Sequence, residues 1–232
     1  MYTLRWEYVT HNKSLFLNGL ELSLKMALFG LLAGSAIGLI FAFLKNSGVR
    51  PLSILVTCYV EFFRNIPLLL IVFFVYYGLP RVFPLGSSQQ KWITRDFLPT
   101  SERTFTFALA IYAGAYLTEI FSAVISSVGK RSLDAGRSLG LPRFALARHV
   151  TTPIMFRTVL PSLSNTFIGL FKDTSIAFAI GVTELSYAAN KISTDYFRVI
   201  EAWTAAGALY LVTSYALALG LRLAERQIKW NV

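Results

Sequence analysis

The chain has 232 residues, of which 55% are hydrophobic and only 15% are charged, and its mean hydropathy is +0.56. These values exclude an ordinary water-soluble domain and are typical of a protein that crosses a membrane several times. The formal net charge is +10, but Lys and Arg gather where apolar runs end, so nucleic acid is not expected as a partner. The single cysteine, Cys58, excludes an intrachain disulfide, and we expect its side chain to be small, apolar and buried.

Five apolar segments are long enough to cross a bilayer as helices, because a hydrocarbon core of about 30 Å requires about 20 helical residues. The first is uncharged between Lys25 and Lys45 and is too long for the core of a signal peptide, so we expect no cleaved leader. No repeat or linker divides the chain. We therefore predict an all-α membrane protein with a single domain, 1–232, and spans at about 15–44, 52–79, 105–128, 159–183 and 202–221.

Basic residues determine the predicted orientation of these spans. The densest cluster lies in segment 129–157 and is therefore expected in the cytoplasm; its members are Lys130, Arg131, Arg137, Arg143, Arg148 and Arg157. Five spans put the termini on opposite sides, so the N-terminus is predicted outside and the C-terminus in the cytoplasm. Segment 80–102, with Pro84, Gly86 and Pro99, is then an irregular outer loop that could meet a soluble partner.

The segment 129–153 has the pattern of two short helices joined by a sharp turn. Ser132 suits the N-cap of a helix over 133–139, and Gly140 can adopt the positive φ that closes it. A second helix over 142–149 has one apolar and basic side, made by Leu141, Phe144, Ala145 and Arg148 at i, i+3, i+4 and i+7. Such a unit can dock into a groove of another protein and pass movement to both flanking spans. The alternative is a basic cytoplasmic loop that is helical without such a role.

Motifs for covalent chemistry are absent from the sequence. No Gly-x4-Gly-Lys-Ser/Thr phosphate loop, His-Glu-x-x-His helix or Gly-x-Ser-x-Gly turn occurs, and only two histidines are present. We therefore expect neither an enzyme nor a metal or cofactor site in this chain. The chain has no evident means of hydrolysing a nucleotide itself. A passive channel or ion-coupled secondary carrier for small polar solutes is one alternative, which would place charges in its spans without needing a docking segment.

Several short motifs occur in a fixed order along the chain. Segment 129–153 reads Asp134-Ala135-Gly136, then Gly140 after three residues, then Val150-x-Thr152-Pro153 after nine. The others are Asn18-Gly19-Leu20, Phe63-Arg64-Asn65-Ile66-Pro67-Leu68-Leu69, Ala115-Tyr116-x-x-Glu119-Ile120 and Lys172-Asp173-Thr174-Ser175. With these motifs the chain resembles the polar amino-acid subfamily of binding-protein-dependent ABC importer permeases, whose EAA loop follows Glu-Ala-Ala-x3-Gly-x9-Ile-x-Leu-Pro.

The chain departs from the EAA pattern in four residues, Asp134 for Glu, Gly136 for Ala, Val150 for Ile and Thr152 for Leu. After Glu-Ile the family often has an Arg and two small residues, whereas this chain has Phe121-Ser122-Ala123-Val124, so no role of that Arg transfers. The spacing and the final proline are kept.

The resemblance implies a type I ABC importer permease fold in a bacterial plasma (inner) membrane. The implied partners are a cytoplasmic ATP-binding subunit that holds ATP and Mg²⁺, a second permease subunit, identical or homologous, an extracytoplasmic solute-binding protein, an amino-acid substrate and membrane lipid. The residues that would contact the ATPase are Asp134, Ala135, Gly136, Gly140, Leu141, Phe144, Arg148 and Pro153.

Ionisable residues inside the predicted spans indicate a cavity or a partner, because an ionised group at mid-membrane costs about 2.5–3.5 kcal/mol. Lys172 and Asp173 are sequence neighbours and point about 100° apart on a helix, so they cannot simply neutralise each other. We interpret them as groups that contact the carboxylate and the ammonium of an amino acid, with hydroxyl groups from Thr174 and Ser175. Structural ion pairs with other charged residues are the alternative.

Arg64, Asn65 and Glu119 complete the predicted substrate pathway. Pro67 has no N–H to bond the carbonyl of residue 63, so we expect a kink beside Arg64 and Asn65, either a gate hinge or a packing feature. Glu119 is expected to anchor helices through a buried ion pair. Asn165 and Glu184 stand behind these as further candidates.

Overall fold

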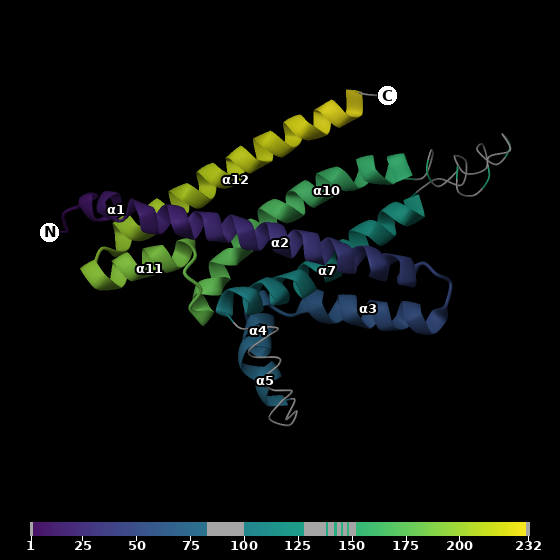
Figure 1. Cartoon of the computed structure of the whole chain (residues 1–232), viewed down its shortest axis with the longest axis horizontal. Coiled ribbons are helices and arrows are strands. Elements are labelled where there is room, and N and C mark those ends of the chain that lie inside the picture. The colour runs from purple at the N-terminus through teal and green to yellow at the C-terminus, as the bar shows by residue number, and fades with distance from the viewer. Residues whose placement is uncertain are drawn as a thin grey trace.

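The structure is a computed structural model that describes residues 2–82, 100–127, 138, 142, 145, 148 and 152–230. Every regular element in these ranges is helical. The long helices α2, α7, α10 and α12 run along the long axis of the molecule, and the chain's two ends lie at opposite ends of that axis (Figure 1). The elements are α1 (Glu7–His11), α2 (Lys13–Lys45), α3 (Arg50–Asn65), α4 (Leu68–Phe73), a π-helix η1 (Phe74–Gly78), α5 (Leu79–Val82), α7 (Ser101–Ser127), α10 (Thr152–Asp173), a 3₁₀ helix η4 (Thr174–Ile180), α11 (Leu185–Tyr196) and α12 (Val199–Trp230).

Four helical segments of the described ranges are long and apolar enough to cross a membrane, namely Lys13–Lys45, Ser101–Ser126, Ile154–Ile180 and Val199–Gln227. The pair Arg50–Asn65 and Leu68–Gly78 brings the number to five if it is one crossing, although it is bent by 107°. The predicted all-α membrane fold is therefore confirmed, and its second span is broken rather than continuous.

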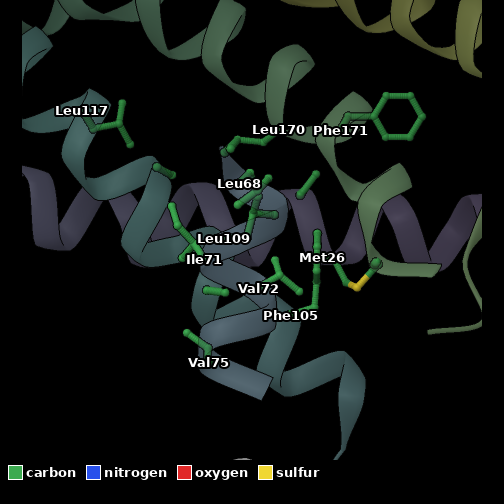
Figure 2. Close-up of a cluster of buried hydrophobic side chains, with 14 of the residues drawn as sticks. Met26, Leu68, Ile71, Val72, Val75, Phe105, Leu109, Leu117, Leu170 and Phe171 are labelled. Carbon is green, nitrogen blue, oxygen red and sulfur yellow. The ribbon is translucent and has the colours of Figure 1, made fainter. Parts of the chain in front are cut away.

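The break in the second span lies at Ile66 and Pro67, where a kink was expected. Both residues have extended backbone, with ψ of 133° and 135°. Proline cannot donate to the preceding turn, and it disfavours helical backbone in the residue before it. α4 leaves this break at a steep angle to α3 and packs against α7 and η4, with its apolar side chains in the cluster that Figure 2 shows.

The helix α10 begins at Thr152, before the start near 159 that the sequence suggested. Pro153 lies in its first turn, where proline is tolerated, while Pro161 lies inside the helix and leaves the carbonyl of Arg157 without its helical donor. After Asp173 the chain tightens into η4, which ends at Gly181 with a φ of 78°. Asp173 therefore stands where the helix type changes, rather than in the middle of a regular span.

Helices α2 and α7 approach each other so closely that α2 has no room for larger side chains. A Cβ added to Gly34 would lie 2.7 Å from the Cβ of Ala113, and one added to Gly38 would lie 2.8 Å from the Cβ of Leu117. Small residues at such contacts favour helix association in lipid, where packing replaces the hydrophobic force. The small buried residues of α2 are Gly19, Ser23, Ala27, Gly30, Gly34, Gly38 and Ala42.

Two apolar clusters complete the interior. The larger joins α2, α4, α7 and α10, and Figure 2 labels ten of its residues: Met26, Leu68, Ile71, Val72, Val75, Phe105, Leu109, Leu117, Leu170 and Phe171. The smaller joins α2, α11 and α12 and is formed by Phe16, Leu185, Ala188, Ala189, Ile192, Ala202 and Ala206. Cys58 is exposed on α3, so the expectation of a buried cysteine was wrong; Val56 and Val60 occupy the buried side of that helix.

The close contact at Gly34 predicts that even one methyl group destabilises the fold. Gly34→Ala should lower the unfolding free energy by about 1–3 kcal/mol through overpacking, less about 1 kcal/mol gained in helix propensity. Gly207→Ala is the matched control, because nothing lies within 4 Å of its added Cβ and it gains the same propensity. Thermal unfolding in detergent compares the two variants, and equal midpoints would contradict the packing argument.

Candidate functional site

A small pocket lies between α7 and α10, where α10 gives way to η4. Its volume is about 190 Å³, and Asp173 is the one charged residue in its described lining. Half of the lining comes from one side of α7 and half from the last turns of α10: Tyr112, Ala113, Tyr116, Ile120, Thr166, Gly169, Leu170 and Asp173.

Two tyrosines of α7 form the wall of this pocket beside Asp173. Tyr112 and Tyr116 are one turn apart, with ring centroids separated by 4.9 Å and hydroxyl oxygens 3.3 Å apart. The guanidinium of Arg64 lies over the ring of Tyr116 at 5.3 Å from its centroid, a cation–π contact that connects α3 to α7. The sequence motif contained Tyr116, but nothing in it singled out Tyr112.

The carboxylate of Asp173 is partly buried and forms no hydrogen bond or ion pair with another described residue. Lys172, its neighbour in sequence, is exposed and does not line the pocket. A carboxylate in a membrane span is costly unless a cation or a polar group faces it. The pocket therefore suits a small ligand with a cationic group, which can contact Asp173 and the tyrosine rings together.

The other predicted pathway residues do not enter the pocket. Thr174 is buried and donates its hydroxyl to the carbonyl of Phe171 at 2.6 Å, and Ser175 is half-buried outside the lining. Asn65 turns back onto its own helix, where it donates to the carbonyl of Glu61 at 2.6 Å and to its carboxylate at 3.1 Å. Of the residues predicted as a pathway, the structure brings only Asp173 into the pocket and Arg64 to its wall.

Glu119 forms an ion pair with Lys45 at the end of α2. The expected ion pair of Glu119 is present, but it is not buried as expected, since both side chains are partly exposed. One turn further along α7, Ser122 accepts a hydrogen bond of 2.8 Å from the amide of Asn46. These contacts fasten the end of α2 to the last turns of α7.

Glu184, which the sequence analysis named only as a further candidate for the substrate pathway, lies at the centre of a buried hydrogen-bond network. It is fully buried and caps α11 by accepting hydrogen bonds of 2.9 Å from the backbone N–H groups of Ser186 and Tyr187. The hydroxyl of Tyr210 on α12 donates to it at 2.9 Å, and that of Ser23 on α2 at 3.3 Å. Burial raises the pKa of the Glu184 carboxyl above its ordinary value, although these hydrogen bonds act to lower it.

A second buried carboxylate, Glu201, fastens the start of α12 to the N-terminal segment. It accepts hydrogen bonds from the hydroxyl of Tyr2 and, at 2.8 Å, from the backbone N–H of Arg5. The guanidinium of Arg198 lies 3.7 Å from the same carboxylate and stacks on the rings of Tyr2 and Tyr8. The Glu201 carboxylate is thus neutralised and hydrogen-bonded by residues of the same chain.

Most of the predicted ATPase-contacting residues lie outside the described residues, namely Asp134, Ala135, Gly136, Gly140, Leu141 and Phe144. Arg148 is exposed, and Pro153 belongs to α10. The end of α7 and the start of α10, which flank this segment, lie at the same end of the molecule as the turn between α2 and α3 and the end of α12 (Figure 1).

Other candidate sites are less suited to a polar ligand. A cavity of about 680 Å³ lies inside the bend between α3 and α4, but its lining is apolar, with no ionisable side chain. In the part of the chain that the structure describes, no three His, Cys, Asp or Glu side chains are placed to hold a metal ion.

Comparison with known proteins places this geometry in a family. The model of the family described as binding-protein-dependent transport system inner membrane component matches residues 34–230. The chain is 31% identical to the probable amino-acid permease protein YxeN of Bacillus subtilis (strain 168), covering 97% of this chain and 96% of YxeN. It is 30% identical to the glutamine transport system permease protein GlnP of Escherichia coli (strain K12), covering 97% of both. A crystal structure of an amino acid ABC transporter with histidines has a TM-score of 0.83 at 28% identity, covering 97% of this chain and 100% of that one.

The network around Glu184 predicts a large stability effect away from the pocket. Glu184→Ala should lower the unfolding free energy by about 3 kcal/mol, because two backbone N–H groups and the Tyr210 hydroxyl lose a buried acceptor. Glu184→Gln keeps one acceptor oxygen and should therefore lower the unfolding free energy by less. Glu21→Ala is the control, since its pair with Lys25 is exposed and screened by water, so its loss should change stability little. Thermal unfolding in detergent should rank the variants in this order; a Glu184→Ala midpoint equal to that of Glu21→Ala would refute it.

Proposed function

The chain belongs to the family of binding-protein-dependent transport system inner membrane components, and we propose that Asp173 in its α7–α10 pocket binds the ammonium group of an amino acid during ATP-driven import. The chain is the membrane-spanning permease subunit of such a system. Its similarity to amino-acid permeases supports an importer subunit over a passive channel or an ion-coupled carrier. The observation that carries the proposed substrate contact is the Asp173 carboxylate, which has no ion pair with a described residue and lies beside two tyrosines.

The proposed substrate pose uses both charges of an amino acid. The ammonium lies between the carboxylate of Asp173 and the ring of Tyr112, where charge and ring quadrupole act together. The guanidinium of Arg64 lies over the ring of Tyr116. In this pose it contacts the substrate carboxylate at the edge of the pocket. A pocket of about 190 Å³ holds the polar head of an amino acid, so the side chain would extend along the pathway toward the second permease subunit.

We further propose that the end of the molecule with the α2–α3 turn faces the cytoplasm. The end of α7 and the start of α10 lie at that end (Figure 1), and they flank the densest cluster of Lys and Arg in the sequence, in segment 129–157; such clusters are retained in the cytoplasm. The termini lie at opposite ends of the long axis, which agrees with an external N-terminus and a cytoplasmic C-terminus (Figure 1). The segment 129–153 then lies in the cytoplasm, where a partner ATPase binds ATP and Mg²⁺.

In this proposal the ATPase acts through the helices that flank segment 129–153. α7 leads into the segment and carries Tyr112 and Tyr116, while α10 leads out of it and carries Asp173. A movement of the segment therefore reaches both walls of the pocket, and the pair between Glu119 and Lys45 transmits it to α2. The solute-binding protein would deliver the amino acid at the opposite end, and a second permease subunit would complete the pathway.

The role of Asp173 is tested by its conversion to an uncharged isostere. Asp173→Asn should reduce uptake at low substrate at least tenfold, because a charge-assisted contact of about 1.5–3 kcal/mol is lost. Asp195→Asn is the control, since Asp195 is exposed and pairs with Lys191 outside the pocket. Uptake of labelled amino acid by proteoliposomes that contain the whole transporter measures both, with ATPase activity as a check of assembly. Unchanged uptake in Asp173→Asn would remove Asp173 from the substrate site.

The coupling role of segment 129–153 is tested at Phe144. Phe144→Ala should lower co-purification of the ATPase and ATP-dependent uptake together, because an aromatic anchor in a docking groove typically contributes more than about 1 kcal/mol. Phe29→Ala, on an exposed face in the middle of α2, should leave the association with the ATPase intact. If Phe144→Ala retains full association and uptake, the segment docks by other residues or not at all.

A further inference from the structure

A second polar pocket lies between α10 and α12, away from the substrate pocket. Its volume is about 190 Å³, which is below the range of about 300–1,000 Å³ typical of pockets for drug-sized ligands. Four apolar and four polar residues line it: Pro161, Ile168, Ala218 and Leu221, and Ser164, Asn165, Arg222 and Glu225. None of these residues takes part in the proposed substrate contact or in the proposed docking of the ATPase.

The level of this pocket in the membrane follows from the positions of the charged residues on α12. Between Glu201 and Arg222 the helix is uncharged over about 20 residues, which span about 30 Å, the thickness of a hydrocarbon core. Arg222 therefore lies at the level where lipid headgroups begin. Leu219 and Leu223 are exposed on the same stretch of helix and can contact an acyl chain at that level.

The pocket offers both signs of charge to a ligand. Arg222 is exposed and forms no ion pair with a described residue, and Arg226, one turn further on, repels it. An anion at Arg222 would relieve that repulsion and could also accept a hydrogen bond from the side-chain amide of Asn165.

Acceptors for a cation lie beside Arg222, one turn further along α12 and on the facing helix α10. One oxygen of Glu225 accepts the hydroxyl of Ser164 at 2.6 Å, which holds the carboxylate in place and leaves its second oxygen for another donor. The carbonyl of Arg157 has lost its helical donor to Pro161 in the pocket wall. A ligand that fits is a zwitterion with an anionic group and an N–H-bearing ammonium a few atoms apart.

We propose that the α10–α12 pocket binds the headgroup of phosphatidylethanolamine, with the phosphate at Arg222 and the ammonium at Glu225. The inner leaflet is its source if the proposed orientation holds, but headgroup binding itself is independent of that orientation. Basic pockets between membrane helices bind anionic lipid headgroups, and Glu225 changes this preference toward a zwitterion. A free amino acid has the same pair of charges, but it lacks the acyl chains that the headgroup depth and the exposed leucines suit.

Native mass spectrometry of the full chain in mild detergent tests this proposal, with three lipids of identical acyl chains as probes. Phosphatidylethanolamine should bind about tenfold more tightly than phosphatidylcholine, whose methylated ammonium has no N–H to donate, and more tightly than phosphatidylglycerol, which has no ammonium. Equal affinities for the ethanolamine and choline lipids would overturn the proposal. Displacement of the bound lipid by millimolar glutamine would also overturn it, because the site would then belong to a free amino acid.

Two variants and a matched control separate the two ends of the headgroup. Arg222→Gln should weaken binding of all three lipids about tenfold, whereas Glu225→Gln should abolish only the preference for ethanolamine over choline. Arg226→Gln, one turn away on the same helix but outside the lining, should retain that preference. Circular dichroism and thermal midpoints verify that each variant is folded. Unchanged lipid affinity in folded Arg222→Gln would overturn the assignment of the phosphate.

Discussion

The contact between α2 and α7 is the constraint on which the rest of the structure depends. Glycines along α2 let the two backbones approach until a single added methyl group at Gly34 or Gly38 would overlap the opposing helix. In lipid, where helices gain little from the hydrophobic effect, such close packing is what holds two helices in one register. That register places Tyr112 and Tyr116 opposite α10, and it brings Glu119 within reach of Lys45.

The distribution of paired and unpaired carboxylates distinguishes structural from functional charge. Glu184 and Glu201 are fully buried, and each accepts several hydrogen bonds, some of them from other helices or from the N-terminal segment. Glu119 has Lys45. Asp173 has no such partner among the described residues, although it lies in the same membrane-crossing core. An uncompensated charge there opposes folding, which is consistent with the proposed role of Asp173 as the contact for a cationic ligand.

Local chemistry accounts for what the sequence predicts well. Span lengths follow from apolar composition, and the break at Pro67 follows from the missing N–H and the restriction on the preceding residue. Contacts between residues that are distant in the sequence could not be predicted in this way. Ser23 and Glu184 are 161 positions apart, and no local pattern indicates that Glu184 would meet the hydroxyls of Ser23 and Tyr210. The span predicted at about 159–183 likewise began too late, because Pro161 lies inside α10, and proline is more common in the first turn of a helix than in its interior.

The central claim, that this permease moves an amino acid under the control of an ATPase, is tested most directly by transport in a defined system. The chain, its ATPase and second permease subunit would be reconstituted in liposomes, with the solute-binding protein and labelled amino acid on the outside and ATP enclosed. An ATP-driven importer should accumulate the amino acid against its concentration gradient, and this accumulation should require both ATP and the binding protein. Uptake that continues at the same rate without ATP, and stops at equal concentrations, would contradict it.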